Sequence, residues 1–206
     1  MYEQYMRIAL AQARRGMGRV SPNPMVGAVV VKRGGIVGMG YHHRAGTPHA
    51  EVHALAQAGE KARNADLYVN LEPCSHFGRT PPCADAIIAS RIRKVVIGMG
   101  DPNPLVSGRG MARLARAGIE IISGVLEEEC RTLNHAYIKY ITRGMPFVIL
   151  KVASSLDGKI ATASGDSRGL TSPPSIRAVH RLRDRVDAIL VGIGTVEADD
   201  PLLTTR

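Results

Sequence analysis

Several residue types are scarce in this sequence. Its 206 residues include no tryptophan, two phenylalanines and three cysteines. So few cysteines exclude a disulfide-stapled scaffold of the kind that small secreted domains use. No apolar run approaches the roughly 18 residues of a membrane-spanning helix, and the polar start, residues 1–5, lacks the apolar region of a signal peptide. We therefore expect a cytoplasmic protein whose core consists of Ala, Val, Ile, Leu and Met.

The formal net charge of the chain is +9. Such a charge suits a nucleic acid or a phosphorylated small molecule as a partner, although a solvated basic surface explains it at least as well. The arginines are spread along the chain without a dense basic run, and no series of aromatic residues is present to stack single-stranded bases. The charge alone therefore does not identify a partner.

The central motif combines one histidine and two cysteines. His49 and Glu51 stand two residues apart, and Pro73-Cys74 and then Cys83 follow. One histidine and two cysteines can hold a zinc ion in three positions and leave the fourth open. Glu51 has no need to be a ligand, so it is free to move protons beside the metal. The pattern H-x-E followed by P-C and a second cysteine is the signature of zinc-dependent base deaminases.

Three other interpretations of this motif stay open. The site could be a closed structural zinc centre with His76 as its fourth ligand, although structural sites usually pair their ligands more tightly. It could stabilise a non-catalytic interaction module. It could also belong to a nucleic-acid deaminase of the tRNA adenosine type. The last is disfavoured because eight residues, 75–82, separate the cysteines, whereas two do so in the usual deaminase signature.

Hydrophobic periodicity and the positions of Gly and Pro predict the elements of the fold. A helix is expected over residues 2–15 and a hairpin over 26–41. Helices and strands then alternate: helix 49–58, strand 67–71, helix 83–90, strand 94–98, helix 108–117, strand 119–122 and a long helix 126–141. Such alternation predicts an α/β fold with a mainly parallel sheet covered on both faces. Both halves of the metal motif fall where loops or strands meet helix starts, as ligand sites of open α/β sheets do.

A linker over residues 144–146 is expected to divide the chain into domains of residues 1–144 and 145–206. After it, the sequence predicts a strand over 147–154, a helix over 172–186 and a strand over 188–191. Roughly 60 residues with two or three strands are too few for an independent core. We expect an incomplete second unit whose exposed strand edges favour association.

Several stretches closely resemble the family of bifunctional riboflavin biosynthesis deaminase–reductases. They read PNPMVG at 22–27, GTPHAEVHAL at 46–55, LEPCSHFGRTPPC at 71–83, and GDPNP at 100–104 followed by GRG at 108–110. The eight-residue insert between the cysteines belongs to that family and separates the chain from cytidine and tRNA adenosine deaminases. The resemblance extends over the whole chain.

For the first domain, the resemblance implies the three-layer α/β/α fold of cytidine deaminases. It also implies removal of the 2-amino group of 2,5-diamino-6-ribosylamino-4(3H)-pyrimidinone 5′-phosphate, with zinc on His49, Cys74 and Cys83 and with Glu51 as the catalytic proton carrier. Arg79 would meet the phosphate, since a guanidinium suits its geometry. The family's polar pocket positions, which would orient base and ribose, match Asn23, His42, Glu72, His76, Asp101 and Asn103. For Asp101 and Asn103, turn chemistry before prolines is a competing explanation.

Residues 145–206 resemble the opening of the family's reductase domain, which is similar to dihydrofolate reductase and uses NADPH. The resemblance implies cofactor contacts at Ala153, Gly169, Thr195 and Asp199, and substrate contacts at Lys151, Ser167, Arg183, Leu203 and Arg206. Gly169 stands where many members have a tryptophan, and the later glycine-rich segment that completes the NADPH site lies beyond this sequence. We therefore expect no reduction by this chain. Members of the family are dimers or tetramers, so we expect a weakly held homo-oligomer with neither a nucleic-acid nor a membrane partner.

Overall fold

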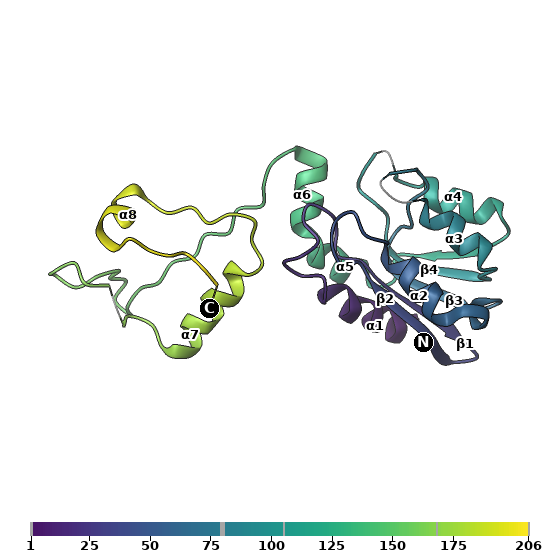
Figure 1. Cartoon of the computed structure of the whole chain (residues 1–206), viewed down its shortest axis with the longest axis horizontal. Coiled ribbons are helices and arrows are strands. Elements are labelled where there is room, and N and C mark those ends of the chain that lie inside the picture. The colour runs from purple at the N-terminus through teal and green to yellow at the C-terminus, as the bar shows by residue number, and fades with distance from the viewer. Residues whose placement is uncertain (1, 79–80, 105, 168, 206) are drawn as a thin grey trace. The chain divides into compact units, whose positions relative to one another are not determined.

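The structure is a computed structural model that describes residues 2–78, 81–104, 106–167 and 169–205. The chain forms two compact units, Met1–Phe147 and Val148–Arg206, and each is described by itself (Figure 1). The predicted domain boundary at residues 144–145 stays a prediction. Among the described residues, no helix has both the length and the apolarity to cross a bilayer.

The first unit is built on a five-stranded sheet with the order β2-β1-β3-β4-β5. Strand β1 pairs antiparallel with β2 and with β3, and β3, β4 and β5 run parallel. The predicted hairpin and the predicted mainly parallel sheet after it are therefore confirmed. The strand bounds are β1 Gly27–Lys32, β2 Gly35–Tyr41, β3 Asp66–Leu71, β4 Lys94–Met99 and β5 Glu120–Ser123.

Helices cover both faces of the sheet and complete the expected three layers (Figure 1). Helices α1 (Tyr2–Arg14) and α5 (Glu127–Leu133) pack on one side, and α2 (Ala50–Ala58), α3 (Cys83–Ala89) and α4 (Arg109–Arg116) lie in a row on the other. A short 3₁₀ turn, η1 (Gly59–Ala62), follows α2. The apolar stripe predicted for the first helix is buried against the sheet, at Met6, Ala9, Leu10 and Ala13.

Small residues determine how closely α2 approaches the sheet. A Cβ atom on Gly38 would lie 2.2 Å from the carbonyl oxygen of Ala54, and one on Gly40 would lie 2.4 Å from that of Ala50. Because side chains at these positions would push the helix away, glycine in β2 is what allows α2 to lie close. This contact fixes the helix that carries Glu51.

The expectation of one long helix over 126–141 is wrong. The segment forms α5 and then α6 (His135–Arg143), and the break falls at Asn134, whose φ and ψ are −106° and 18°. The Asn134 side chain is buried and bonds the backbone of Met25 at both its N–H (2.8 Å) and its carbonyl (3.0 Å). A tertiary contact therefore interrupts a sequence whose local pattern is continuous.

The second unit contains α7 (Pro173–Arg183), which confirms the helix expected near 172–186, and α8 (Ile193–Asp199), which was not expected. The strands expected over 147–154 and 188–191 are not formed among the described residues. A strand needs a neighbour to satisfy its backbone N–H and C=O groups, and these segments have none in the unit. Their apolar side chains are accordingly exposed, as at Val148, Leu150 and Leu190.

Candidate functional site

The three predicted metal ligands come together at one edge of the sheet. His49 caps α2, Cys74 follows β3, and Cys83 is the first residue of α3. Their ligand atoms all lie within 4.8 Å of one another, and His49 Nδ1 is 3.1 Å from Cys83 Sγ and 3.6 Å from Cys74 Sγ. Tetrahedral zinc with nitrogen at about 2.1 Å and sulfur at about 2.3 Å sets N···S separations of about 3.6 Å. The donor set therefore fits zinc.

Hydrogen bonds within the cluster set its protonation. The pKa of Cys74 is lowered to about 4, first because the Cys83 thiol donates to it and also through His49 and the Cys83 backbone N–H. The pKa of Cys83 is raised, because its proton is held by Cys74 and its surroundings are buried. The hydrogen bond to Cys74 in turn raises the pKa of His49. These contacts favour the thiolate form of Cys74, and thiolate is the form that binds metal.

Glu51 lies beside the cluster, in the first turn of α2, but its carboxylate is not one of the clustered ligands. The side chain is 3% exposed, and its Oε2 is buried with no hydrogen-bond partner among the described residues. Burial raises its pKa to about 7. A nearby cation would offset the cost of burying this carboxylate, so the unpartnered oxygen also fits a metal site with a proton carrier beside it.

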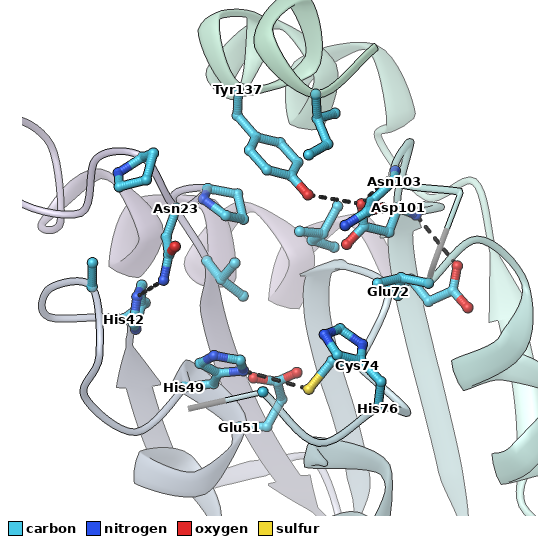
Figure 2. Close-up of a pocket in the computed structure, with 18 of the residues that line it drawn as sticks. Asn23, His42, His49, Glu51, Glu72, Cys74, His76, Asp101, Asn103 and Tyr137 are labelled. Atoms are coloured by element: carbon cyan, nitrogen blue, oxygen red, sulfur yellow. Dashed lines mark hydrogen bonds between the residues drawn. The ribbon is translucent and has the colours of Figure 1, made fainter. Parts of the chain in front are cut away.

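The site opens into a cavity of about 460 Å³, a size that suits a small organic ligand. Figure 2 shows the polar side chains that project into it above His49, Glu51 and Cys74. His76 lines this cavity but is not part of the ligand cluster, so the described residues supply three ligands and leave a position open. The other predicted pocket residues that line it are Asn23, His42, Glu72, Asp101 and Asn103.

Asn23 and His42 form a pair on one wall. Asn23 Nδ2 lies 3.0 Å from His42 Nε2 (Figure 2). His42 Nδ1 lies 3.3 Å from the Pro48 carbonyl oxygen. A carbonyl can only accept, so Nδ1 carries the proton and Nε2 accepts from the amide. Burial lowers the pKa of His42, which favours this neutral tautomer. The Asn23 carbonyl oxygen is then oriented by the histidine.

Glu72 has a structural role that the sequence did not predict. Its Oε2 accepts from the backbone N–H of Asp101 (3.3 Å) and Gly108 (3.0 Å), and its Oε1 accepts from those of Gly110 (3.0 Å) and Met111 (3.1 Å). A buried carboxylate with four such donors ties the end of β3 to the loop after β4 and to the start of α4. Its predicted contact with substrate stays a prediction.

The opposite wall contains Asp101, which is buried. Its Oδ1 accepts from the backbone N–H of Asn103 and from the Tyr137 hydroxyl, each at 2.9 Å. The first hydrogen bond is of the kind that forms in turns, as expected for an Asp before a proline. The second was not expected: Tyr137, with Tyr140 and Ile141, lines the cavity from α6. Their i, i+3, i+4 spacing was the available signal, but it also describes an ordinary apolar helix face.

The remaining predicted residues are less informative. Arg79 and Arg206 lie outside the described residues. In the second unit, Arg183 Nη1 donates to the Thr204 carbonyl. Ala153, Arg183 and Leu203 are half-buried, and the exposed positions are Lys151, Ser167, Gly169, Thr195 and Asp199. Their predicted contacts with NADPH and substrate stay predictions.

Comparison with known proteins finds a matching family model for each half of the chain. The family model of the cytidine and deoxycytidylate deaminase zinc-binding region matches residues 1–99, and that of the RibD C-terminal domain matches residues 146–206. The riboflavin biosynthesis protein RibD of Aquifex aeolicus is 57% identical over 99% of this chain and 57% of its own length. The Escherichia coli protein of the same name is 54% identical over 99% and 56%.

A solved structure is similar over the same range. The diaminohydroxyphosphoribosylaminopyrimidine deaminase/5-amino-6-(5-phosphoribosylamino)uracil reductase of Thermotoga maritima is 51% identical, with a TM-score of 0.94. The match covers 100% of this chain and 59% of that one. The chain thus spans a little over half the length of the relatives that it matches.

Proposed function

Because this chain belongs to the family of the riboflavin biosynthesis protein RibD, we propose that it is a zinc-dependent aminohydrolase of a phosphorylated pyrimidine. The substrate is 2,5-diamino-6-ribosylamino-4(3H)-pyrimidinone 5′-phosphate, and the reaction replaces its 2-amino group with oxygen and releases ammonia. One observation carries the proposal: Glu51, a buried carboxylate whose Oε2 has no hydrogen-bond partner among the described residues, lies beside a three-ligand cluster that faces a cavity.

His49, Cys74 and Cys83 hold the zinc in this proposal. When bound, zinc supplies Lewis acidity that makes water a competent nucleophile at neutral pH. The protein's share is to present one nitrogen and two sulfurs at a fixed spacing and to leave a position open toward the cavity. His76 remains outside the cluster and is assigned to the pocket wall.

Glu51 moves the protons. Hydrolysis takes a proton from water and needs protons on the ring nitrogen and on the leaving amine, so one group that accepts and returns protons serves the whole reaction. The Glu51 carboxylate suits this role because it is buried, has a free acceptor oxygen, and lies on a helix whose position is fixed by close packing on β2.

The polar walls orient the pyrimidine nucleotide. Asn23, oriented by neutral His42, offers its carbonyl oxygen on one side, and Asp101 offers a carboxylate on the other. In this proposal they bind amino and hydroxyl groups of the base and ribose, with His76 and Asn103 as further polar contacts. Arg79 is assigned to the phosphate because a guanidinium can form two parallel hydrogen bonds to it.

For the second unit, the match to the RibD C-terminal domain supports an NADPH-dependent reductase function in the family's longer chains. A cytoplasmic location and a homo-oligomeric state stay predictions, and no nucleic-acid partner is proposed.

An ammonia-release assay with competing substrates tests the proposal. The zinc-loaded chain is incubated separately with the diaminopyrimidinone nucleotide, with deoxycytidylate and with tRNA, and ammonia is measured. Ammonia from the first substrate alone is expected. Release only from tRNA would instead identify a nucleic-acid deaminase. Bound zinc without ammonia from any substrate would identify a non-catalytic module. Either result would overturn the proposal.

A further inference from the structure

Helix α6 forms a wall of the cavity, and its position is fixed at its first turn. Asn134, the residue just before α6, is buried and bonds both backbone groups of Met25. Asn70 also bonds the Met25 carbonyl, at 3.0 Å. Met25 follows the pocket residue Asn23 by two positions. The start of α6 is therefore attached to the loop that carries one side of the pocket.

One turn further along α6, Tyr137 reaches the other side of the pocket. Its hydroxyl donates to Asp101 Oδ1 at 2.9 Å, across the cavity wall (Figure 2). Both hydrogen bonds that the described residues give the Asp101 side chain fall on this oxygen, the other coming from the Asn103 backbone N–H. Two donors on Oδ1 fix the plane of the carboxylate and leave Oδ2 as the oxygen available to a ligand.

The hydrogen bond between Tyr137 and Asp101 lies outside the region that the deaminase family model matches. The family model of the deaminase zinc-binding region ends at residue 99, whereas Asp101 and Tyr137 come after it. The metal cluster and Glu51 fall inside the matched region. Residues that distinguish one deaminase substrate from another are therefore expected in the later wall rather than beside the metal.

We propose that Tyr137 is a positioning residue for substrate selection, which acts by holding the Asp101 carboxylate in the orientation that binds a hydrogen-bond donor of the pyrimidine nucleotide. The inference rests on the proposed function for the identity of the ligand. Tyr137 does not touch the reacting atoms in this account. Loss of its hydroxyl leaves zinc and Glu51 in place and weakens binding, because Asp101 is then held by one donor instead of two.

The test compares Tyr137→Phe with Tyr5→Phe. Tyr5 is a suitable control because its hydroxyl also donates one hydrogen bond, at 2.7 Å to the Gly34 carbonyl, but it lies outside the cavity. For Tyr137→Phe we expect a KM raised on the order of tenfold with kcat changed less than about twofold. Zinc content stays that of the parent, and Tyr5→Phe leaves KM unchanged. A lowered zinc content, or an unchanged KM, would overturn the proposal.

A double-mutant cycle tests whether Tyr137 affects nucleotide binding through Asp101. In the Asp101→Ala chain, adding Tyr137→Phe should change KM no further, whereas independent effects would multiply and contradict the proposal. The same four chains, each carrying Glu51→Gln to prevent turnover, are titrated with the nucleotide by calorimetry. If Tyr137→Phe weakens nucleotide binding only in the chains that keep Asp101, the role of Tyr137 is supported even when the parent chain releases no ammonia. Failure of the deaminase proposal and failure of this one therefore give different results.

Discussion

The backbone N–H of Cys83 lies 3.3 Å from Cys74 Sγ and donates a hydrogen bond to it. The next N–H, that of Ala84, donates to the Cys74 carbonyl at 3.1 Å. The first turn of α3 is therefore bonded directly to Cys74, and these bonds hold the two sulfurs near each other. A ligand pair ordered in this way binds metal with less loss of conformational entropy than a flexible loop would.

The first prediction concerns these cysteines. Cys74→Ser and Cys83→Ser should each lower zinc content from about one ion per chain to near zero, because serine offers no thiolate. Elemental analysis after dialysis measures it. Cys130→Ala is the control, since Cys130 is buried as Cys83 is but lies in α5, outside the cluster. Equal zinc in all three variants would refute the ligand assignment.

The second prediction concerns Arg113 on α4, which contacts a residue close to each of the two cysteines. Its Nη2 lies 2.6 Å from Asp85 Oδ1, and its Nη1 donates to the Ser75 carbonyl at 3.3 Å. Arg113→Ala should weaken zinc binding by about tenfold, the low end for residues that support metal ligands, because the ion pair is half exposed. Competition with a chromogenic chelator measures it. The exposed Arg116, on the same helix, is the control, and an equal loss in Arg116→Ala would contradict this role.

The third prediction concerns Glu72. Glu72→Gln replaces one acceptor oxygen with an NH₂ group that faces backbone donors, so the free energy of unfolding should fall by about 2–3 kcal/mol. Glu120→Gln is the comparison, because the Glu120 carboxylate is exposed and forms an ion pair with Lys94. Loss of that ion pair should cost less than about 1 kcal/mol. Urea denaturation of both variants decides the matter, and a similar small loss in both would show that the four bonds to Glu72 contribute little.

The fourth prediction concerns pH. Burial raises the pKa of Asp101 above 3.8, so the folded chain holds this proton more tightly than the unfolded chain does. The free energy of unfolding therefore falls as pH rises from about 3.8 to the raised pKa, and is level above it. Asp101→Asn removes the titrating carboxyl group and with it this fall in the free energy of unfolding. The variant should gain stability relative to the parent as pH rises through that window, while its affinity for the nucleotide falls. A pH-independent difference in urea denaturation would contradict the assignment.

Local patterns were sufficient for much of this fold. The spacing of Met6, Ala9, Leu10 and Ala13 predicts the buried face of α1, and the β-branched runs around Gly34 and Gly35 predict the hairpin. The metal motif was visible because chemistry restricts both the residue types and their order. The ligands then meet in space because each stands at a junction between elements.

Contacts between distant segments could not be predicted in the same way. Asn134 breaks a helix because it bonds Met25, 109 positions away, and the same contact holds the start of α6, the helix from which Tyr137 lines the pocket. The backbone hydrogen bonds of Glu72 could not be predicted either, because its four partners lie 29 to 39 positions away. The two strands expected in the second unit failed for a related reason, since a strand forms only where another strand is available to pair.

The proposed catalytic role of Glu51 is tested most directly by Glu51→Gln, assayed for zinc content and for ammonia release from the diaminopyrimidinone nucleotide. The amide has nearly the same shape but cannot carry the proton, so kcat should fall by roughly 10²- to 10⁴-fold while about one zinc per chain is retained. Glu60→Gln, in the exposed turn after α2, should match the parent chain. Full activity in Glu51→Gln, or no ammonia release from the zinc-loaded parent, would contradict the account.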